Sequence, residues 1–200
     1  MTEKTPLQVP QLETERLLIR RLRIEDTAAM LAILSDPETV RYWGRPAMTE
    51  LQQAEAYTRE NLRWMKDGHC LYWAIEEKAS GQMIGTCTLF KLDINNRRGE
   101  IGYLLNRAYW HRGLMSEVLK SVIDYAFREL QLHRLEADTD PENAASIRLL
   151  ENFGFQREGL FRDRWRVDGR WCDSLMMGLV HDSSHNAGAN LAVGASLARD

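Results

Sequence analysis

The sequence is poor in cysteine and has no long apolar run. Its three cysteines, Cys70, Cys87 and Cys172, form no C-x-x-C pair, which excludes a disulfide framework and a cysteine-rich zinc site. No stretch of about 18 apolar residues occurs, so no segment is expected to span a bilayer. Residues 1–11 carry charges and two prolines instead of an apolar signal-peptide segment. We therefore expect a cytoplasmic protein with reduced thiols and no metal site.

A surplus of charge of either sign is also missing. The chain has 26 Lys and Arg against 29 Asp and Glu, a net charge of -3. Proteins that bind nucleic acid usually carry a basic surplus, so we expect neither a nucleic-acid nor a membrane partner. The motifs G-x-x-x-x-G-K-[ST] and G-x-G-x-x-G are absent, which removes the usual support for ATP and dinucleotides. With 44% hydrophobic residues among 200, the chain can build one core.

Hydrophobic periodicity predicts the order of the elements. Strand patterns cover 16–23, 71–76, 82–90, 99–106, 134–139, 155–160 and 171–180, and helical patterns cover 25–34, 49–66, 114–130 and 141–153. The order β-α-α-β-β-β-α-β-α-β-β contains one strand-helix-strand crossover, which implies one parallel strand pair. We expect the α/β (α+β) class, with a mixed, mainly antiparallel sheet of six to seven strands and helices on both faces.

Capping residues predict where the helices begin and end. Asp36-Pro37 should stop the first helix, and Thr49 with Gln52 reads as a capping box that opens the second. Asp140-Pro141 should open the last helix, with Gly154 as its left-handed end.

We expect an N-terminal extension over 1–11, one domain over 12–180 and a disordered tail over 181–200, where strand patterns and strong apolar anchors are missing.

The passage most informative about chemistry is E-I-G-Y-L-L-N-R-A-Y-W-H-R-G-L-M-S-E, which runs from Glu100 to Glu117. A strand ends, a short loop follows, and a long helix begins near Gly113. The first turn of a helix presents unpaired N–H groups and a partial positive charge, which suit a phosphate. Gly113 lets a ligand approach the backbone, and Ser116 adds a hydroxyl. The alternative is an ordinary turn in which the glycine only relieves strain.

This passage resembles the acetyl-CoA loop of the GNAT N-acetyltransferases, and most of all their RimJ/RimL-like branch of ribosomal-protein-alanine N-acetyltransferases. The blocks that carry the resemblance are L-E-T-E-R-L-L-I-R at 12–20, E-I-G-Y with Y-W-H-R-G-L-M-S-E within 100–117, and N-A-A-S with L-L-E-N-F-G-F within 143–155. They stand in the family's order between about 12 and 180. The resemblance implies a GNAT-like fold. Homodimers are frequent in the family, so a homodimer is one expectation.

The family implies a function as well. An acetyl group would move from acetyl-CoA to a primary amine by direct attack in a ternary complex, with the N-terminal α-amine of a peptide, such as a ribosomal protein, as the first candidate acceptor. Two alternatives remain open. One is acetylation of a small amine (an amino acid, an antibiotic or a polyamine), and the other is a CoA-binding sensor without catalysis.

The resemblance also implies the residues that bind acetyl-CoA. Backbone amides of the loop would hold the pyrophosphate, the backbone at Leu104 or Leu105 would pair with the pantetheine arm and donate to the oxyanion, and Asn143 would hydrogen-bond the arm. The full set of expected contacts is Leu104, Leu105, Asn106, His111, Arg112, Gly113, Leu114, Met115, Ser116 and Asn143.

Two residues are candidates for proton transfer. Glu100 occupies a strand position at which many family members carry a carboxylate base, and apolar neighbours there would raise its pKa. The alternative is a surface Glu. The tyrosine that protonates the leaving thiolate in many members is replaced by Leu150. Ser146, one helical turn after Asn143, is our candidate for that proton, and a serine bonded to a nearby carbonyl is the alternative.

The sequence constrains the roles of residues on the acceptor side less closely, and two interpretations remain for each. Tyr42 and Trp43, between the first two helices, are expected to line the acceptor cleft, or else to be aromatic packing anchors. Arg164, within the basic run 162–166, is expected to read a substrate carboxylate or peptide, or else to lie in a solvated loop.

Overall fold

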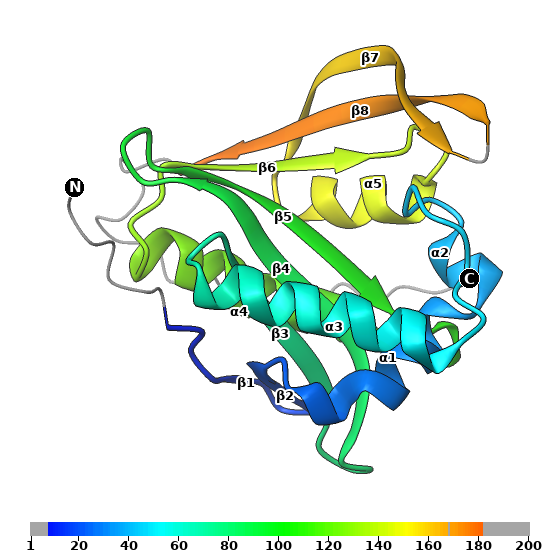
Figure 1. The fold of residues 1–200 in the computed structure, drawn as a ribbon. Coiled ribbons are helices and arrows are strands. Elements are labelled where there is room, and N and C mark those ends of the chain that lie inside the picture. The colour runs from blue at the N-terminus through cyan, green and yellow to red at the C-terminus, as the bar shows by residue number, and fades with distance from the viewer. Residues whose placement is uncertain (1–7, 168, 182–200) are drawn as a thin grey trace, which may run out of the picture.

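A twisted sheet forms the centre of the computed structural model, which describes residues 8–167 and 169–181 (Figure 1). Within these residues the sheet has eight strands in the order β1-β2-β3-β4-β5-β6-β8-β7. The strands are β1 (Leu12–Glu13), β2 (Leu17–Arg21), β3 (Cys70–Glu77), β4 (Gln82–Asp93), β5 (Arg98–Leu105), β6 (Arg134–Thr139), β7 (Gln156–Val167) and β8 (Arg170–Val180). Among the described strands, only β5 and β6 pair in parallel, as the predicted crossover requires.

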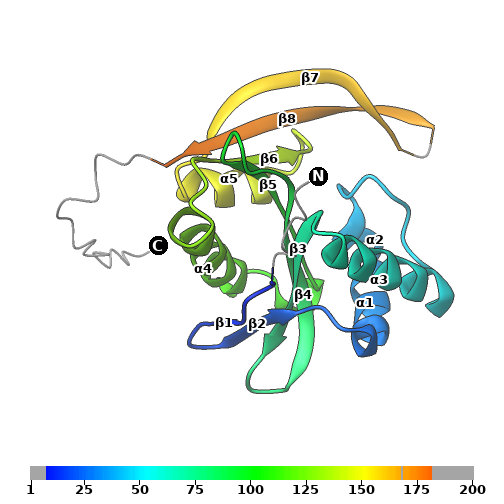
Figure 2. The same cartoon turned by 60° about the vertical axis from the view of Figure 1, so that its left-hand side comes forward.

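Helices cover both faces of the sheet, as predicted. They are α1 (Thr27–Leu34), α2 (Pro37–Val40), α3 (Leu51–Lys66), α4 (Leu114–Arg128) and α5 (Ala144–Asn152), with short 3-10 turns η1 (Ile24–Asp26) and η2 (Arg107–Tyr109). Figure 2 shows α4 and α5 on one side of the sheet and α1, α2 and α3 on the other. No helix in the described part of the chain is long and apolar enough to cross a membrane.

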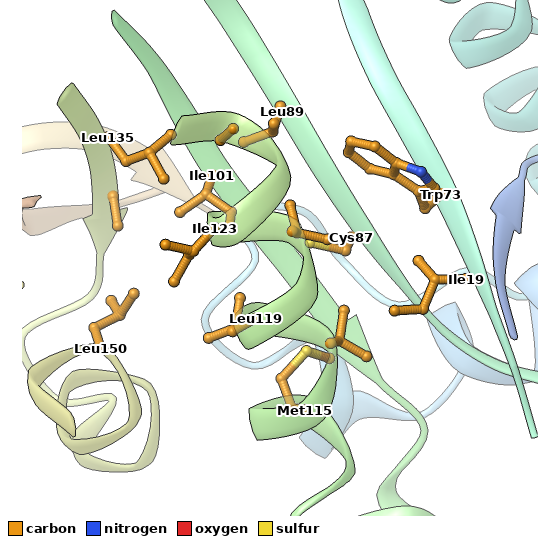
Figure 3. Packing of buried hydrophobic residues seen from close by; sticks show 14 of the residues in the cluster. Ile19, Trp73, Cys87, Leu89, Ile101, Met115, Leu119, Ile123, Leu135 and Leu150 are labelled. Atoms are coloured by element: carbon orange, nitrogen blue, oxygen red, sulfur yellow. The ribbon is translucent and has the colours of Figure 1, made fainter. Parts of the chain in front are cut away.

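Two apolar cores lie on the opposite faces of the sheet. The larger joins α4 and α5 to the sheet, and Figure 3 shows Leu119 and Ile123 of α4 packed against Ile101 of β5. The smaller core joins α1 and α3 to the same strands through residues such as Met30 and Tyr72. Because successive strand residues point to opposite faces, each central strand contributes to both cores.

The sheet opens between β5 and β6. Their pairing covers only Arg98–Glu100 with Arg134–Glu136, and Glu100 opposite Glu136 is the last pair. Beyond it β5 continues along β4, while β6 continues along β8, and Figure 1 shows the two strands diverging. The backbone edge of β5 from Ile101 to Leu105 therefore has no strand partner on this side among the described residues.

The structure corrects two predicted features in the first part of the chain. Among the described residues the sheet has eight strands instead of six to seven, because β1, only two residues long and thus without a readable pattern, pairs with β2. The first helix ends before Asp36-Pro37, as predicted, and Pro37 also occupies the first position of the short helix α2, where a proline's missing N–H costs nothing. The capping box of α3 lies one residue later than predicted, between Glu50 and Gln53.

Two further predictions fail near the C-terminus. Asp140-Pro141 does not open α5, because Asp140 accepts a hydrogen bond from the Glu142 N–H in a turn and Asn143 is the N-cap. The basic run 162–166 is part of β7, paired with β8 around an irregularity between Phe161 and Trp165. Gly154 adopts the predicted left-handed conformation. The extension and tail lie mostly outside the described residues.

Candidate active site

Glu100 lies at the point where the sheet opens. It is the last residue of β5 that pairs with β6, and it is only 5% exposed. Ile101 packs into the core under α4, so Glu100 points to the opposite face, the one that carries α1 and α3. The alternation of β5 predicted this separation. Glu100 is therefore a buried carboxyl at the start of the opening and does not fit the alternative of a surface glutamate.

Lys91 neutralises this buried carboxylate. Its ammonium donates to Glu100 Oε2 at 2.7 Å from a left-handed position in β4, where the register of β4 and β5 shifts. Burial raises the pKa of Glu100, the Lys91 ammonium opposes that rise, and the negative charges of Asp138 and Glu136 add to it. The pKa of the Glu100 carboxyl therefore lies above its ordinary value.

The loop after β5 is fixed by its own side chains. Asn106 accepts a hydrogen bond from the Ala108 N–H and caps η2. The Trp110 indole donates to the Leu105 carbonyl at 2.7 Å, which holds the loop against the end of β5. His111 and Gly113 both have positive φ, 59° and 71°. Alternation of left-handed and ordinary residues turns successive N–H groups toward one side, the geometry of an anion-binding nest.

The amides of this loop are available to a ligand. Among the described residues, the backbone N–H groups from His111 to Ser116 donate to no protein acceptor; the first helical hydrogen bond is Glu117 N–H to the Gly113 carbonyl, at 3.3 Å. Three of these amides form the first turn of α4, where the helix carries its partial positive charge. The loop thus meets the requirements of a pyrophosphate: several converging donors, no Cβ at Gly113, and no competing acceptor in contact.

Arg16 contributes a charge beside the loop that sequence reasoning missed. It lies next to Gly113, with Nη2 3.7 Å from the position that a Cβ on Gly113 would take. Its guanidinium pairs with Glu117, whose other oxygen accepts from the Thr14 hydroxyl at 2.7 Å. Nothing in the sequence links Arg16 to a helix about 100 residues away. This contact ties the turn between β1 and β2 to the first turn of α4.

Asn143 and Ser146 lie on the other side of the opening, at the start of α5. The Asn143 carboxamide oxygen caps the helix by accepting from the Ser146 N–H at 3.1 Å, which leaves its NH₂ group without an acceptor among the described residues. The Ser146 hydroxyl is 2.7 Å from the phenol of Tyr103 on β5. Ser146 is therefore bonded to a side chain of the diverging strand and not to a helix carbonyl.

Tyr103 is a second feature that sequence reasoning did not find. Alternation places it on the face opposite to Glu100, but no pattern couples it to a serine 43 positions later. Burial raises the pKa of Tyr103 to about 12. The phenol is therefore protonated at neutral pH and can donate to Ser146. Leu150, at the position of the missing tyrosine, is a core residue.

The three residues expected on the acceptor side, Tyr42, Trp43 and Arg164, lie in different surroundings. Trp43 packs edge-on against Tyr57 of α3, with ring centroids 5.3 Å apart, as expected for a packing anchor. Tyr42 is partly buried, and Arg41 stacks over its ring. Arg164 lies on β7, not in a loop, and its Nε is 3.8 Å from Asp138 Oδ2 of β6.

A cavity of about 490 Å³ lies beside the loop after β5. It is lined by Asp36, Asn106, Arg107 and Ala108. Arg107 pairs with Asp36 at 3.0 Å, so the loop after β5 contacts the segment between α1 and α2.

The described residues contain no group of three or more histidine, cysteine or acidic side chains arranged to hold a metal ion.

Comparisons with known proteins find a family model and related proteins. The family model described as "Acetyltransferase (GNAT) domain" matches residues 16–156. The uncharacterized N-acetyltransferase p20 of Bacillus licheniformis is 38% identical over 173 residues, which cover 84% of this chain and 95% of that protein. The [ribosomal protein uS5]-alanine N-acetyltransferase of Escherichia coli is 30% identical over 120 residues, 58% of this chain and 60% of that protein.

Solved structures share the fold. Mycobacterium smegmatis RimJ in complex with CoA-disulfide superposes with a TM-score of 0.75 at 24% identity, covering 86% of this chain and 85% of that one. At this identity the likeness concerns the fold alone.

Proposed function

Because the chain belongs to the GNAT acetyltransferase family and is an N-acetyltransferase, we propose that it moves the acetyl group of acetyl-CoA to a primary amine by direct attack in a ternary complex. The acceptor we favour is the N-terminal α-amine of a peptide or protein. A relative that is 30% identical is named as a [ribosomal protein uS5]-alanine N-acetyltransferase, which supports this choice.

The observation that carries the proposal is the set of free amides from His111 to Ser116 next to the opening of the sheet. Phosphates bound at the start of α4 leave the unpaired edge of β5 for the pantetheine arm, in the manner of an added strand. The arm then points the thioester toward the divergence of β5 and β6. The Asn143 NH₂ group borders the same opening and is free to donate to an amide of the arm.

Glu100 is the base in this proposal. An α-amine has a pKa of about 7.7–8.0, so near neutral pH it needs to lose one proton before it attacks. Glu100 accepts that proton, directly or through one water, and its raised pKa matches it to the task. The nitrogen then bonds to the acetyl carbonyl carbon, and a backbone N–H near Leu104 or Leu105 stabilises the oxyanion.

Ser146 and Tyr103 act on the leaving group. When the carbon–sulfur bond breaks, the electron pair stays on sulfur, and the thiolate needs one proton. The Ser146 hydroxyl is proposed to donate it, and Tyr103, 2.7 Å away, to restore the proton to Ser146. The attacking nitrogen loses its second proton to solvent as the amide forms, Glu100 returns the first proton to solvent, and Tyr103 regains its proton from solvent. One proton is therefore released for each acetyl group transferred. In this scheme Tyr103 is a positioning residue because it acts through Ser146.

The test is thiol release from acetyl-CoA with a panel of amines. The panel contains peptides that begin with Ala or Ser, the same peptides with a blocked N-terminus, free amino acids and polyamines. Release with unblocked peptides alone supports the proposal, and mass spectrometry should place one acetyl group on the α-nitrogen.

The other outcomes are distinct. Release with small amines alone would replace the acceptor by a small molecule, while tight CoA binding without release would make the protein a sensor. Failure to bind CoA would remove the assignment of the His111–Ser116 loop.

A further inference from the structure

Asp138 is a second carboxylate at the opening of the sheet. It lies on β6 two residues after Glu136, at a point where β6 no longer pairs with β5. Leu135 and Ala137 belong to the core under α4 and α5, so Glu136 and Asp138 point to the opposite face. This is the face on which Glu100 lies. The negative charge of Asp138 contributes to the raised pKa of Glu100, as expected for neighbouring carboxylates.

The three carboxylates on this face are not equally neutralised. Glu100 is held by Lys91 at 2.7 Å, and Glu136 is held by Arg134 at 2.9 Å, with Arg98 at 3.5 Å. Among the residues that the structure describes, the only cation paired with Asp138 is Arg164, whose Nε is 3.8 Å from Oδ2. That distance is too long for a hydrogen bond. Asp138 is therefore the carboxylate with capacity for a further cation.

The carboxylate of Asp138 is nevertheless held in a fixed orientation. Its Oδ1 accepts a hydrogen bond from the hydroxyl of Ser174 on β8, which is 1% exposed. The Asp138 side chain itself is 13% exposed. Its Oδ2 accepts no hydrogen bond from a described residue, so one oxygen is fixed and the other is available. A carboxylate fixed in this way is suited to bind a cation with little loss of side-chain entropy.

Building on the proposed function, we propose that Asp138 binds the ammonium form of the acceptor amine and that Arg164 binds an oxygen of the same acceptor. An ammonium at Oδ2 replaces the loose contact with the Arg164 guanidinium, which then turns its N–H groups to the acceptor. The acceptor class is therefore an amine with a carbonyl or carboxylate oxygen nearby, as in an amino acid or a peptide N-terminus.

The same arrangement disfavours polyamines. A polyamine offers no acceptor oxygen to Arg164, and its second ammonium meets the positive charges along β7, where Arg162 and Arg166 flank Arg164 and are exposed. Proton transfer fits this placement, because an amine first held at Asp138 passes its proton to Glu100 on the same face. Asp138 holds the charged form of the amine, and Glu100 generates the neutral form.

Asp138→Asn provides the first test, with steady-state kinetics on an Ala-initiated peptide. A charge-assisted hydrogen bond lost from binding predicts a rise of about 10- to 100-fold in the KM for the amine. The Kd for CoA should change less than about twofold, and the change in the KM should exceed the change in kcat, because the charge of Asp138 also acts on the pKa of Glu100. The matched control is Asp163→Asn, which removes one exposed carboxylate from β7 at a left-handed position that Asn tolerates.

Arg164→Gln provides the second test, with a readout of selectivity. The ratio of kcat/KM for alanine amide to that for an unsubstituted alkylamine should fall about tenfold, because only the first has an oxygen for Arg164. Arg148→Gln removes the same charge from α5, on the other face of the sheet, and should leave the ratio unchanged.

Ser174→Ala provides a third test. It keeps the charges of Asp138 and Arg164 but removes the hydrogen bond that orients the Asp138 carboxylate. We expect the KM for the amine to rise by about two- to fivefold.

The outcomes separate this inference from the proposed function. Turnover by the wild type with an unchanged KM in Asp138→Asn, or with a loss confined to kcat, would overturn the role of Asp138 alone. An unchanged selectivity ratio in Arg164→Gln would overturn the assigned acceptor class. Absence of turnover by the wild type with every amine would instead contradict the proposed function. If Asp138→Asn does not fold, Ser174→Ala and Arg164→Gln decide the question.

Discussion

At the scale of single residues, the site depends on the groups that surround the buried carboxyl of Glu100. Glu100 is removed from water by its position in the sheet, and desolvation is the largest influence on its pKa. Lys91 reaches it only because β4 bulges, which lets a left-handed residue turn its side chain back toward β5. The balance between these two effects sets the pH at which Glu100 can accept a proton.

Replacement of Lys91 tests that balance. Catalysis requires ionised Glu100, so kcat/KM falls as the pH drops through the pKa of Glu100, which lies above the ordinary value. Lys91 lowers this pKa, and Lys91→Met should raise it and move the acidic limb of the kcat/KM profile to higher pH. Lys78→Met, which removes a lysine from the turn after β3, is the control.

Glu100→Gln completes the experiment. Loss of a general base typically costs about 100-fold or more in rate, and the loss should be greatest where the amine is protonated, below about pH 7.7–8.0. An acidic limb that stays in place in Lys91→Met, or that lies at the same pH in Glu100→Gln as in the wild type, would remove Glu100 from its proposed role.

The hydrogen bond between Ser146 and Tyr103 gives a second prediction. If Tyr103 acts through Ser146, Ser146→Ala should lower kcat by about 100-fold, Tyr103→Phe should lower it less, and the double variant should match Ser146→Ala. Kinetics with saturating peptide and acetyl-CoA measure this cycle. Additive losses would show that the two hydroxyls act separately. A further variant, Tyr125→Phe, removes a phenol on α4 outside the site and should leave kcat unchanged.

Single residues also show what a sequence reveals of a site. The face of Glu100 follows from strand alternation, a rule that needs only local information. The contact of Ser146 with Tyr103 and that of Glu117 with Arg16 join residues 43 and 101 positions apart. Such pairs depend on how elements pack, and no local pattern contains that information.

At the scale of elements, the start of α4 depends on Gly113. Its φ of 71° is left-handed, and an alanine there meets a strain of about 1–2 kcal/mol. Gly113→Ala should therefore lower the free energy of unfolding by about that amount and also weaken CoA binding by tenfold or more, because a Cβ would occupy the surface beside Arg16. Chemical denaturation and titration with CoA measure the two effects.

Gly81→Ala is the matched control for this variant. Gly81 has a φ of 66° in the turn between β3 and β4, and a Cβ there has no atom within 4 Å. It should show a similar loss of stability with unchanged CoA affinity. Equal CoA affinity in both variants would contradict the assignment of the loop as the phosphate site.

The end of a helix was predicted correctly where only one residue is a candidate for it. Gly154 ends α5 because a left-handed residue is needed there. The prediction failed where two candidates compete: Asp140 and Asn143 can both cap a helix, and packing selects Asn143, whose side chain accepts from Ser146. β7 was predicted too short, because a strand exposed on both faces has no apolar alternation to read.

At the scale of the whole molecule, the proposed CoA site is shared by elements that the chain keeps apart. The edge of β5, the start of α4 and the cap of α5 surround one opening, and each is anchored to the sheet by the larger core. Parallel pairing of β5 and β6 ends after three residue pairs. The order of elements predicted one parallel pair, but the length of that pairing, and thus the opening, follows from the twist and from the competing partners β4 and β8.

This arrangement predicts how CoA changes global stability. A ligand that binds only the folded state at 100 times its Kd contributes about 2.7 kcal/mol. For a chain of 200 residues, each kcal/mol corresponds to about 2–4 °C, so the Tm should rise by about 5–10 °C in a calorimetric scan. Pantetheine, which lacks the phosphates, should give a much smaller shift at the same concentration. Equal shifts would mean that the amides at the start of α4 bind no phosphate, because those donors are what distinguish the two ligands.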